Sequence, residues 1–168
     1  MIDTLDNGII GLTYQGLEEL STMKKEDIIS KLGKFRYGMN GFWLITGAAL
    51  VLYGIRAETE DIDMGCTTEI ANLLEADGYL YKVTEDGNRW FKLGDDIEVF
   101  ENWLFGSIQM ICGYPVMSLQ GIREMKQHLG REKDLRDIQL IDAYPTFMKE
   151  YLPSKQSGIE HTVTDEIV

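Results

Sequence analysis

The sequence has few cysteines, few histidines and no long apolar segment. Its 168 residues include only two cysteines, Cys66 and Cys112, and two histidines. Two cysteines without a CxxC spacing exclude a disulfide-rich secreted scaffold, and two isolated histidines exclude zinc ligation of the HxH or HxxxH type. No apolar run approaches the roughly 20 residues that cross a bilayer, and the first residues lack the basic and apolar regions of a signal peptide. We therefore expect a cytoplasmic protein with no membrane association.

Positive charge is also scarce. The chain carries 16 basic and 28 acidic residues, which gives a net charge of −12. A surface this acidic repels phosphate backbones, so extended nucleic-acid binding is not expected. A small anionic ligand remains compatible with this charge, provided that a metal ion and a few local cations receive it.

Hydrophobic periodicity predicts an α/β (α+β) domain, with a mixed β-sheet flanked by helices and further helices at the C-terminus. The predicted elements are helices within 16–35, a strand at 42–46, a short helix at 48–53, a strand at 61–66, a helix at 67–78, strands at 79–84, 89–93, 96–100, 108–111 and 114–117, and helices at 118–128, 132–144 and 145–151. We expect one domain over 1–152, with its core at about 40–117 and a helical part at 118–152. A flexible acidic tail is expected at 153–168.

Two aspartates stand one residue apart in the predicted strand at 61–66. Residues i and i+2 of a strand point to the same side, so Asp61 and Asp63 are expected to project together while Ile62 faces the core. Two carboxylates this close repel each other unless a cation lies between them, and Mg²⁺ prefers oxygen ligands and phosphates. Glu98 is the candidate third carboxylate from a neighbouring strand, with Asp96 as the fallback.

The glycine at the preceding strand–helix junction suggests a phosphate contact. Gly47 allows close approach of the backbone to a phosphate, beside the N-terminus of the helix predicted to follow. Thr46, or a backbone amide near Ala48, could serve the same phosphates. Arg56 lies in the next loop and is expected either to contact phosphate or to neutralise the carboxylates.

These residues resemble the signature of the nucleotidyltransferase superfamily, whose palm is like that of DNA polymerase β. Gly47-Ala48 is followed, fourteen positions after the glycine, by the acidic-apolar-acidic triplet that starts at Asp61. A second segment, Gly130 to Ile138, is similar to the R-x-K-D-x-x-D pattern that small bacterial members carry on a C-terminal helix. In size and order of motifs the chain is similar to lincosamide nucleotidyltransferases.

The resemblance implies an Mg²⁺- or Mn²⁺-dependent enzyme that transfers a nucleoside monophosphate, AMP from ATP or the equivalent from another nucleoside triphosphate, to an unidentified hydroxyl acceptor. By this likeness Asp61, Asp63 and Glu98 are the catalytic and metal-binding residues. The implied nucleotide contacts are Thr46, Gly47, Ala48, Arg56, Arg131 and Lys133. A homodimer is a further expectation.

Other interpretations stay open. Glu98 could be an exposed strand acid paired with Lys92 or Arg89, and the charged residues at 131–137 could form a solvated helix face. Ala48 stands where the family commonly has serine or glycine, and Glu98 stands where aspartate is more common. The alternative function is therefore a nucleotidyltransferase-like protein with weak or no activity, a binding or regulatory partner such as a toxin–antitoxin component. An Mg²⁺-dependent phosphohydrolase is a third possibility.

Overall fold

The computed structural model describes residues 21–151, with side chains described through residue 144. Its elements, in chain order, are α1 (Lys25–Gly33), β1 (Phe42–Ile45), α2 (Thr46–Leu52), β2 (Ile62–Cys66), α3 (Thr68–Ala76), β3 (Tyr81–Val83), β4 (Arg89–Leu93), β5 (Ile97–Glu101), β6 (Ile108–Ile111), β7 (Tyr114–Met117), α4 (Leu119–Leu129) and α5 (Glu132–Tyr151). The predicted tail at 153–168 lies outside the described residues, as does the part of the first predicted helical region before residue 21.

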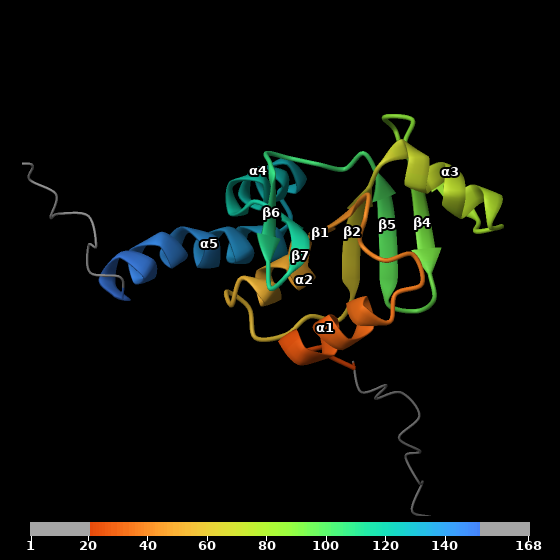
Figure 1. Ribbon diagram of the computed structural model, residues 1–168. Coiled ribbons are helices and arrows are strands. Elements are labelled where there is room, and N and C mark those ends of the chain that lie inside the picture. The colour runs from red at the N-terminus through yellow and green to blue at the C-terminus, as the bar shows by residue number, and fades with distance from the viewer. Residues whose placement is uncertain (1–20, 152–168) are drawn as a thin grey trace, which may run out of the picture.

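The strands form one seven-stranded mixed sheet with the order β3-β4-β5-β2-β1-β7-β6. The pairs β2–β5 and β1–β7 are parallel, and the other neighbouring pairs are antiparallel. Helices α4 and α5 gather near β6 and β7, whereas α3 lies beside β4 (Figure 1). The predicted fold class, a mixed sheet flanked by helices with further C-terminal helices, is confirmed.

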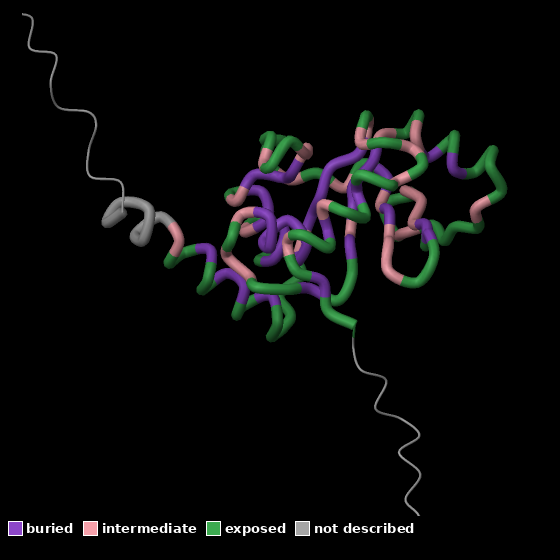
Figure 2. Tube along the Cα trace, turned by 60° about the horizontal axis from the view of Figure 1, so that its bottom comes forward, coloured by how far each residue is buried: buried purple, intermediate pink, exposed green. Residues whose placement is uncertain are grey.

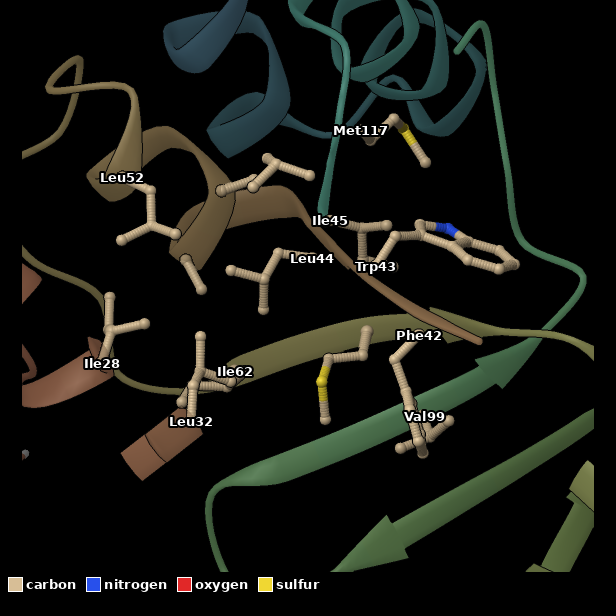
Figure 3. Close-up of a cluster of buried hydrophobic side chains, with 14 of the residues drawn as sticks. Ile28, Leu32, Phe42, Trp43, Leu44, Ile45, Leu52, Ile62, Val99 and Met117 are labelled. Carbon is tan, nitrogen blue, oxygen red and sulfur yellow. The ribbon is translucent and has the colours of Figure 1, made fainter. Parts of the chain in front are cut away.

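The strand register builds a continuous apolar row on one face of the sheet. Each member of this row pairs with the next and is fully buried: Phe91, Val99, Met64, Leu44 and Val116. Two residues of α1, Ile28 and Leu32, approach this face beside Ile62 (Figure 3). Side chains on a strand alternate between faces, so the next row of the same strands must project to the other side.

The α2 helix has only seven residues, and its stability comes from burial and not from its length. All its residues from Gly47 to Leu52 are buried, as expected of a helix that is apolar on every side. Buried residues run through the middle of the molecule, while loops and helix exteriors are exposed (Figure 2). Within residues 21–151, no helix is both long and apolar enough to cross a membrane.

Capping residues explain where the other helices begin and end. The Thr67 side chain accepts a hydrogen bond at the start of α3, and Ser118 does the same for α4, which ends at Gly130 with a left-handed φ of 63°. The predicted break before Pro145 is wrong, since α5 continues to Tyr151. The φ of proline is itself helical, so the chain continues through it at the loss of one hydrogen bond.

Candidate active site

The parallel pairing of β2 and β5 brings two of the predicted carboxylates side by side. Asp63 and Glu98 are register partners, and neighbouring strands lie about 4.8 Å apart. Asp61 directly precedes β2 and opens to the same cavity, so the three carboxylates share one space. The fallback carboxylate, Asp96, is hydrogen-bonded to Lys31 and does not line this cavity.

The cavity has a volume of about 610 Å³, within the range of roughly 300–1,000 Å³ that holds small-molecule ligands. Its wall on the sheet side is acidic, and basic side chains enter it from the loop after α2 and from α4 and α5. The predicted nucleotide contacts that line it are Thr46, Gly47, Arg56, Arg131 and Lys133. Ala48 does not line it, because its side chain is fully buried in the core.

Asp63 lies in an environment that disfavours its negative charge. Burial raises its pKa from 3.8 to about 6, and the charge of Asp61 and, more weakly, that of Glu98 act in the same direction. A hydrogen bond from Thr46 and the charge of Lys133 lower the pKa, but they do not outweigh the burial. The carboxylate cluster therefore has an excess of negative charge that a bound cation would relieve.

Thr46 contacts a carboxylate, although the sequence indicated a phosphate contact. Its hydroxyl donates a hydrogen bond of 2.8 Å to Oδ2 of Asp63. Its φ of 54° is unusual for a β-branched residue, so the junction between β1 and α2 holds Thr46 in a strained conformation. The strain is consistent with a residue whose side chain has to reach one particular carboxylate.

The backbone at Gly47 is closely covered by side chains from the following loop. A Cβ atom at this position would lie 2.5 Å from Oγ1 of Thr59 and 2.9 Å from a terminal guanidinium nitrogen of Arg56. A larger residue here would therefore force Thr59 and Arg56 to shift. The guanidinium of Arg56 occupies the space directly over Gly47, which places a cation where the sequence predicted a phosphate to approach.

The solvated helix face that was the alternative for residues 131–137 is in fact partly buried. Asp134 is fully buried and accepts hydrogen bonds from Arg131 at 2.7 Å and from Lys126 at 3.4 Å. Lys126, only 3% exposed, also pairs with Asp137 at 2.8 Å, and Arg56 approaches Asp137 at 3.8 Å. These pairs connect α4, α5 and the loop after α2, and so they hold the basic wall of the cavity in place.

The donor chemistry of the carboxylate cluster fits a hard divalent cation. In the described part of the chain, no group of three histidine, cysteine, aspartate or glutamate side chains is placed so that it could hold a metal ion by itself. Asp61 and Asp63 nevertheless supply oxygen ligands to one space, and Mg²⁺ commonly binds through one or two carboxylates plus substrate phosphates. The carboxylates thus fit a magnesium ion that enters together with a phosphorylated ligand.

Sequence reasoning missed several residues of this region. Glu101 is buried and accepts hydrogen bonds from the Arg89 guanidinium at 2.8 and 2.9 Å. The Arg89 partner considered for Glu98 is therefore occupied elsewhere. Lys126 also lines the cavity, and its only signal in the sequence is a cationic residue in the last turn of the helix predicted at 118–128.

Comparisons with known proteins add one distant likeness. No family model matches the chain, and no curated protein matches it. Among solved structures, a lincosamide antibiotic adenylyltransferase with lincomycin bound is 19% identical to the chain, with a TM-score of 0.46; the match covers 73% of this chain and 98% of that one. Because this likeness is too distant to transfer an activity, the side chains of the cavity have to carry the functional argument.

Proposed function

We propose that the protein is an Mg²⁺-dependent nucleotidyltransferase that transfers AMP from ATP to a hydroxyl group of a small molecule or a macromolecule. The observation that carries this proposal is the arrangement of charge around one cavity. Three carboxylates, Asp61, Asp63 and Glu98, lie on the sheet side, and cationic side chains enter from the helices and from the loop after α2. A triphosphate with its divalent cation is a ligand that matches both walls.

In this proposal each wall of the cavity has a separate task. Asp61 and Asp63 would hold the magnesium ion, and the hydrogen bond from Thr46 would fix the orientation of Asp63. When bound, the ion supplies positive charge between carboxylates and phosphates and offsets the charge that develops on the leaving group. Arg56 and Lys133 would bind the phosphate oxygens from the opposite side.

Glu98 is suited to activate the acceptor, since it lines the cavity beside Asp63. The acceptor hydroxyl oxygen forms a bond to the α-phosphorus, and the bond from that phosphorus to the bridging oxygen breaks. Pyrophosphate leaves with the electron pair, and the hydroxyl proton passes to Glu98, which acts as general base. Positioning of the reactants and fixed charges would provide most of the acceleration.

The decisive experiment is a transfer screen with ATP labelled at the α-phosphate. The full chain is incubated with Mg²⁺ and with panels of aminoglycosides, lincosamides, tRNA and proteins. We expect label on one acceptor class and release of pyrophosphate. Asp63→Asn should lower turnover by about a thousandfold or more, which corresponds to ~4 kcal/mol in the activation barrier, while the circular dichroism spectrum and the thermal transition stay those of a folded protein.

Asp96→Asn is the matched control, because Asp96 is also an acid next to β5 but lies outside the cavity. Its turnover should stay within a few-fold of wild type. Transfer by Asp63→Asn at the wild-type rate would contradict the proposal. Release of inorganic phosphate in place of pyrophosphate would instead indicate a phosphohydrolase.

A second candidate function is nucleotide binding without transfer. The observation in its favour is that cationic residues of the cavity already have acidic partners within the chain, as Arg131 has Asp134 and Lys126 has Asp137. A binding or regulatory protein of this type would bind ATP with Mg²⁺ in calorimetry and release no pyrophosphate with any acceptor panel. The same screen therefore separates the two functions.

A further inference from the structure

The two edges of the sheet differ in how they are protected against pairing with another strand. The β3 edge has only three residues, its central residue is Lys82, and two acids follow in its hairpin, Glu85 and Asp86. Short length and charge are the usual means by which an edge strand avoids association. The β6 edge is uncharged, and no residue from 102 to 122 carries a charge in a chain whose net charge is −12.

The backbone of β6 has hydrogen-bonding groups that point away from the sheet. The hairpin turn at Cys112-Gly113 has positive φ at both residues, so Ile111 and Tyr114 form the hydrogen-bonded pair that closes it. Hydrogen-bonded and non-bonded pairs alternate along the hairpin, and a 2.7 Å bond from the Ser118 N–H to the Ser107 carbonyl fits this alternation. The N–H and C=O groups of Ile108 and Met110 therefore face outward.

Apolar side chains accompany these outward-facing groups. Ile108 is 42% exposed and Met110 is 66% exposed. Within residues 21–151, no strand pairs with the outer side of β6. An uncharged edge with open backbone groups and exposed apolar side chains is typical of a strand that takes a partner.

We propose that β6 pairs antiparallel with β6 of a second copy of this chain, across a twofold axis at Gln109, and extends the two sheets into one. Ile108 of one copy would exchange its outward backbone hydrogen bonds with Met110 of the other, and the reverse. A twofold contact requires a self-complementary surface, and an antiparallel uncharged strand meets this condition. Two copies with a net charge of −12 each also approach with the least repulsion where neither carries charge.

Charge also favours a second copy over other partners. A basic or acidic partner would find no counter-charge on β6, and an anionic membrane surface requires the Lys and Arg residues that this face lacks. The inference does not depend on the proposed enzymatic activity, because its readout is the state of association. A failure of the transfer assay would leave it intact.

The test is the mass of the full chain in solution, measured by light scattering and sedimentation over a range of micromolar concentrations. We expect a species of twice the chain mass of 19.2 kDa. Met110→Lys places like charges close to the axis and should raise the dimer dissociation constant by about a hundredfold or more, because like charges repel across the contact. Val83→Lys is the matched control, because Val83 is 64% exposed on the β3 edge, and it should remain dimeric.

Hydrogen exchange provides a second readout that does not require a stable variant. The amides of Ile108 and Met110 should gain protection as the wild-type concentration rises, in step with the dimer mass. A wild-type chain that stays monomeric throughout would overturn the proposal, as would equal dissociation of Met110→Lys and Val83→Lys. Concentration-independent protection that disappears when residues 1–20 are deleted would also overturn it, because the edge would then be covered by the chain's own N-terminal segment.

Discussion

Two adjacent rows of side chains on the same strands lie in very different environments. One row, Phe91, Val99, Met64 and Leu44, is apolar and fully buried. The row beside it in register, Lys92, Glu98, Asp63 and Ile45, faces the other way and is mostly polar. A shift of one residue along β2 and β5 thus separates the core from the cavity. The pleat of a sheet allows a single strand to stabilise the fold with one set of side chains and to present carboxylates with the other.

Two buried acids of these strands, Glu101 and Asp63, also differ in how their charge is compensated. Glu101 belongs to the core-facing side of β5, and hydrogen bonds and the charge of Arg89 lower its pKa. Asp63 faces the cavity, and burial with nearby carboxylates raises its pKa to about 6. An acid that serves the fold is neutralised by a cation of the chain itself, whereas Asp63 is left with an unfavourable charge. An uncompensated negative charge such as that of Asp63 is what a site needs in order to attract a cation.

The largest effect on stability without an effect on turnover is expected from Met64→Ala, one residue from Asp63. Met64 is fully buried between its register partners Leu44 and Val99, so the truncation should lower the free energy of unfolding by about 3 kcal/mol. Denaturant titration measures this loss, and Met64→Leu, which nearly conserves volume, should cost less than about 1.5 kcal/mol. Turnover per folded molecule should not change in either variant. If fully folded Met64→Ala lost turnover, the buried apolar row and the cavity-facing row would not act independently.

The pH dependence of stability should have opposite signs for the two acids. The folded-state pKa of Asp63 is raised from its ordinary 3.8 to about 6. The stability that Asp63 contributes to the folded state is therefore fully present below about pH 4 and is lost as the pH rises through about 6. In metal-free protein, Asp63→Asn should therefore gain about 2 kcal/mol over wild type between pH 4 and pH 7. Glu101, whose pKa is lowered, contributes stability above its ordinary pKa and loses it as the pH falls.

Denaturant titrations of wild type, Asp63→Asn and Glu101→Gln at several pH values measure both signs. Added Mg²⁺ with ATP should reduce the gain of Asp63→Asn over wild type, because only the wild-type carboxylate would bind the cation strongly. A constant difference between wild type and Asp63→Asn across this pH range would contradict the assignment of an unfavourable charge to Asp63.

The smallest effect is expected from Gly47→Ala at the rim of the cavity. The added methyl group would press on Thr59 and Arg56, and overpacking of this kind costs about 1–2 kcal/mol, partly offset by the better helix propensity of alanine. We also expect weaker ATP binding in calorimetry, since Arg56 has to move. Gly33→Ala in α1 is the control, because its Cβ would make only one ordinary contact at 4.0 Å with Tyr114. Equal ATP affinity in both variants would remove Arg56 from the proposed phosphate contacts.

Alternation and turn chemistry predicted most of the fold. The strand at 89–93 and both strands of the 108–117 hairpin appear at the predicted bounds. Thr67 and Ser118, the first residues of two predicted helices, are the N-caps of α3 and α4. The continuation of α5 past Pro145 was missed, because proline lowers helix stability without forbidding a helix. That Asp61 and Asp63 face the same side could be proposed from parity alone, whereas the place of Glu98 beside Asp63 depends on the pairing of β2 with β5.

Which side chains share a face follows from the order of the amino acids alone, because a strand repeats every two residues and a helix every 3.6. The positions of the turns follow from it as well, because glycine and capping residues act locally. Other features are visible only in the folded chain: β5 lies beside β2, Thr46 turns toward Asp63, and Lys126 is enclosed by Asp134 and Asp137. These contacts join segments distant in sequence, and their choice depends on the free energy of packing the whole chain.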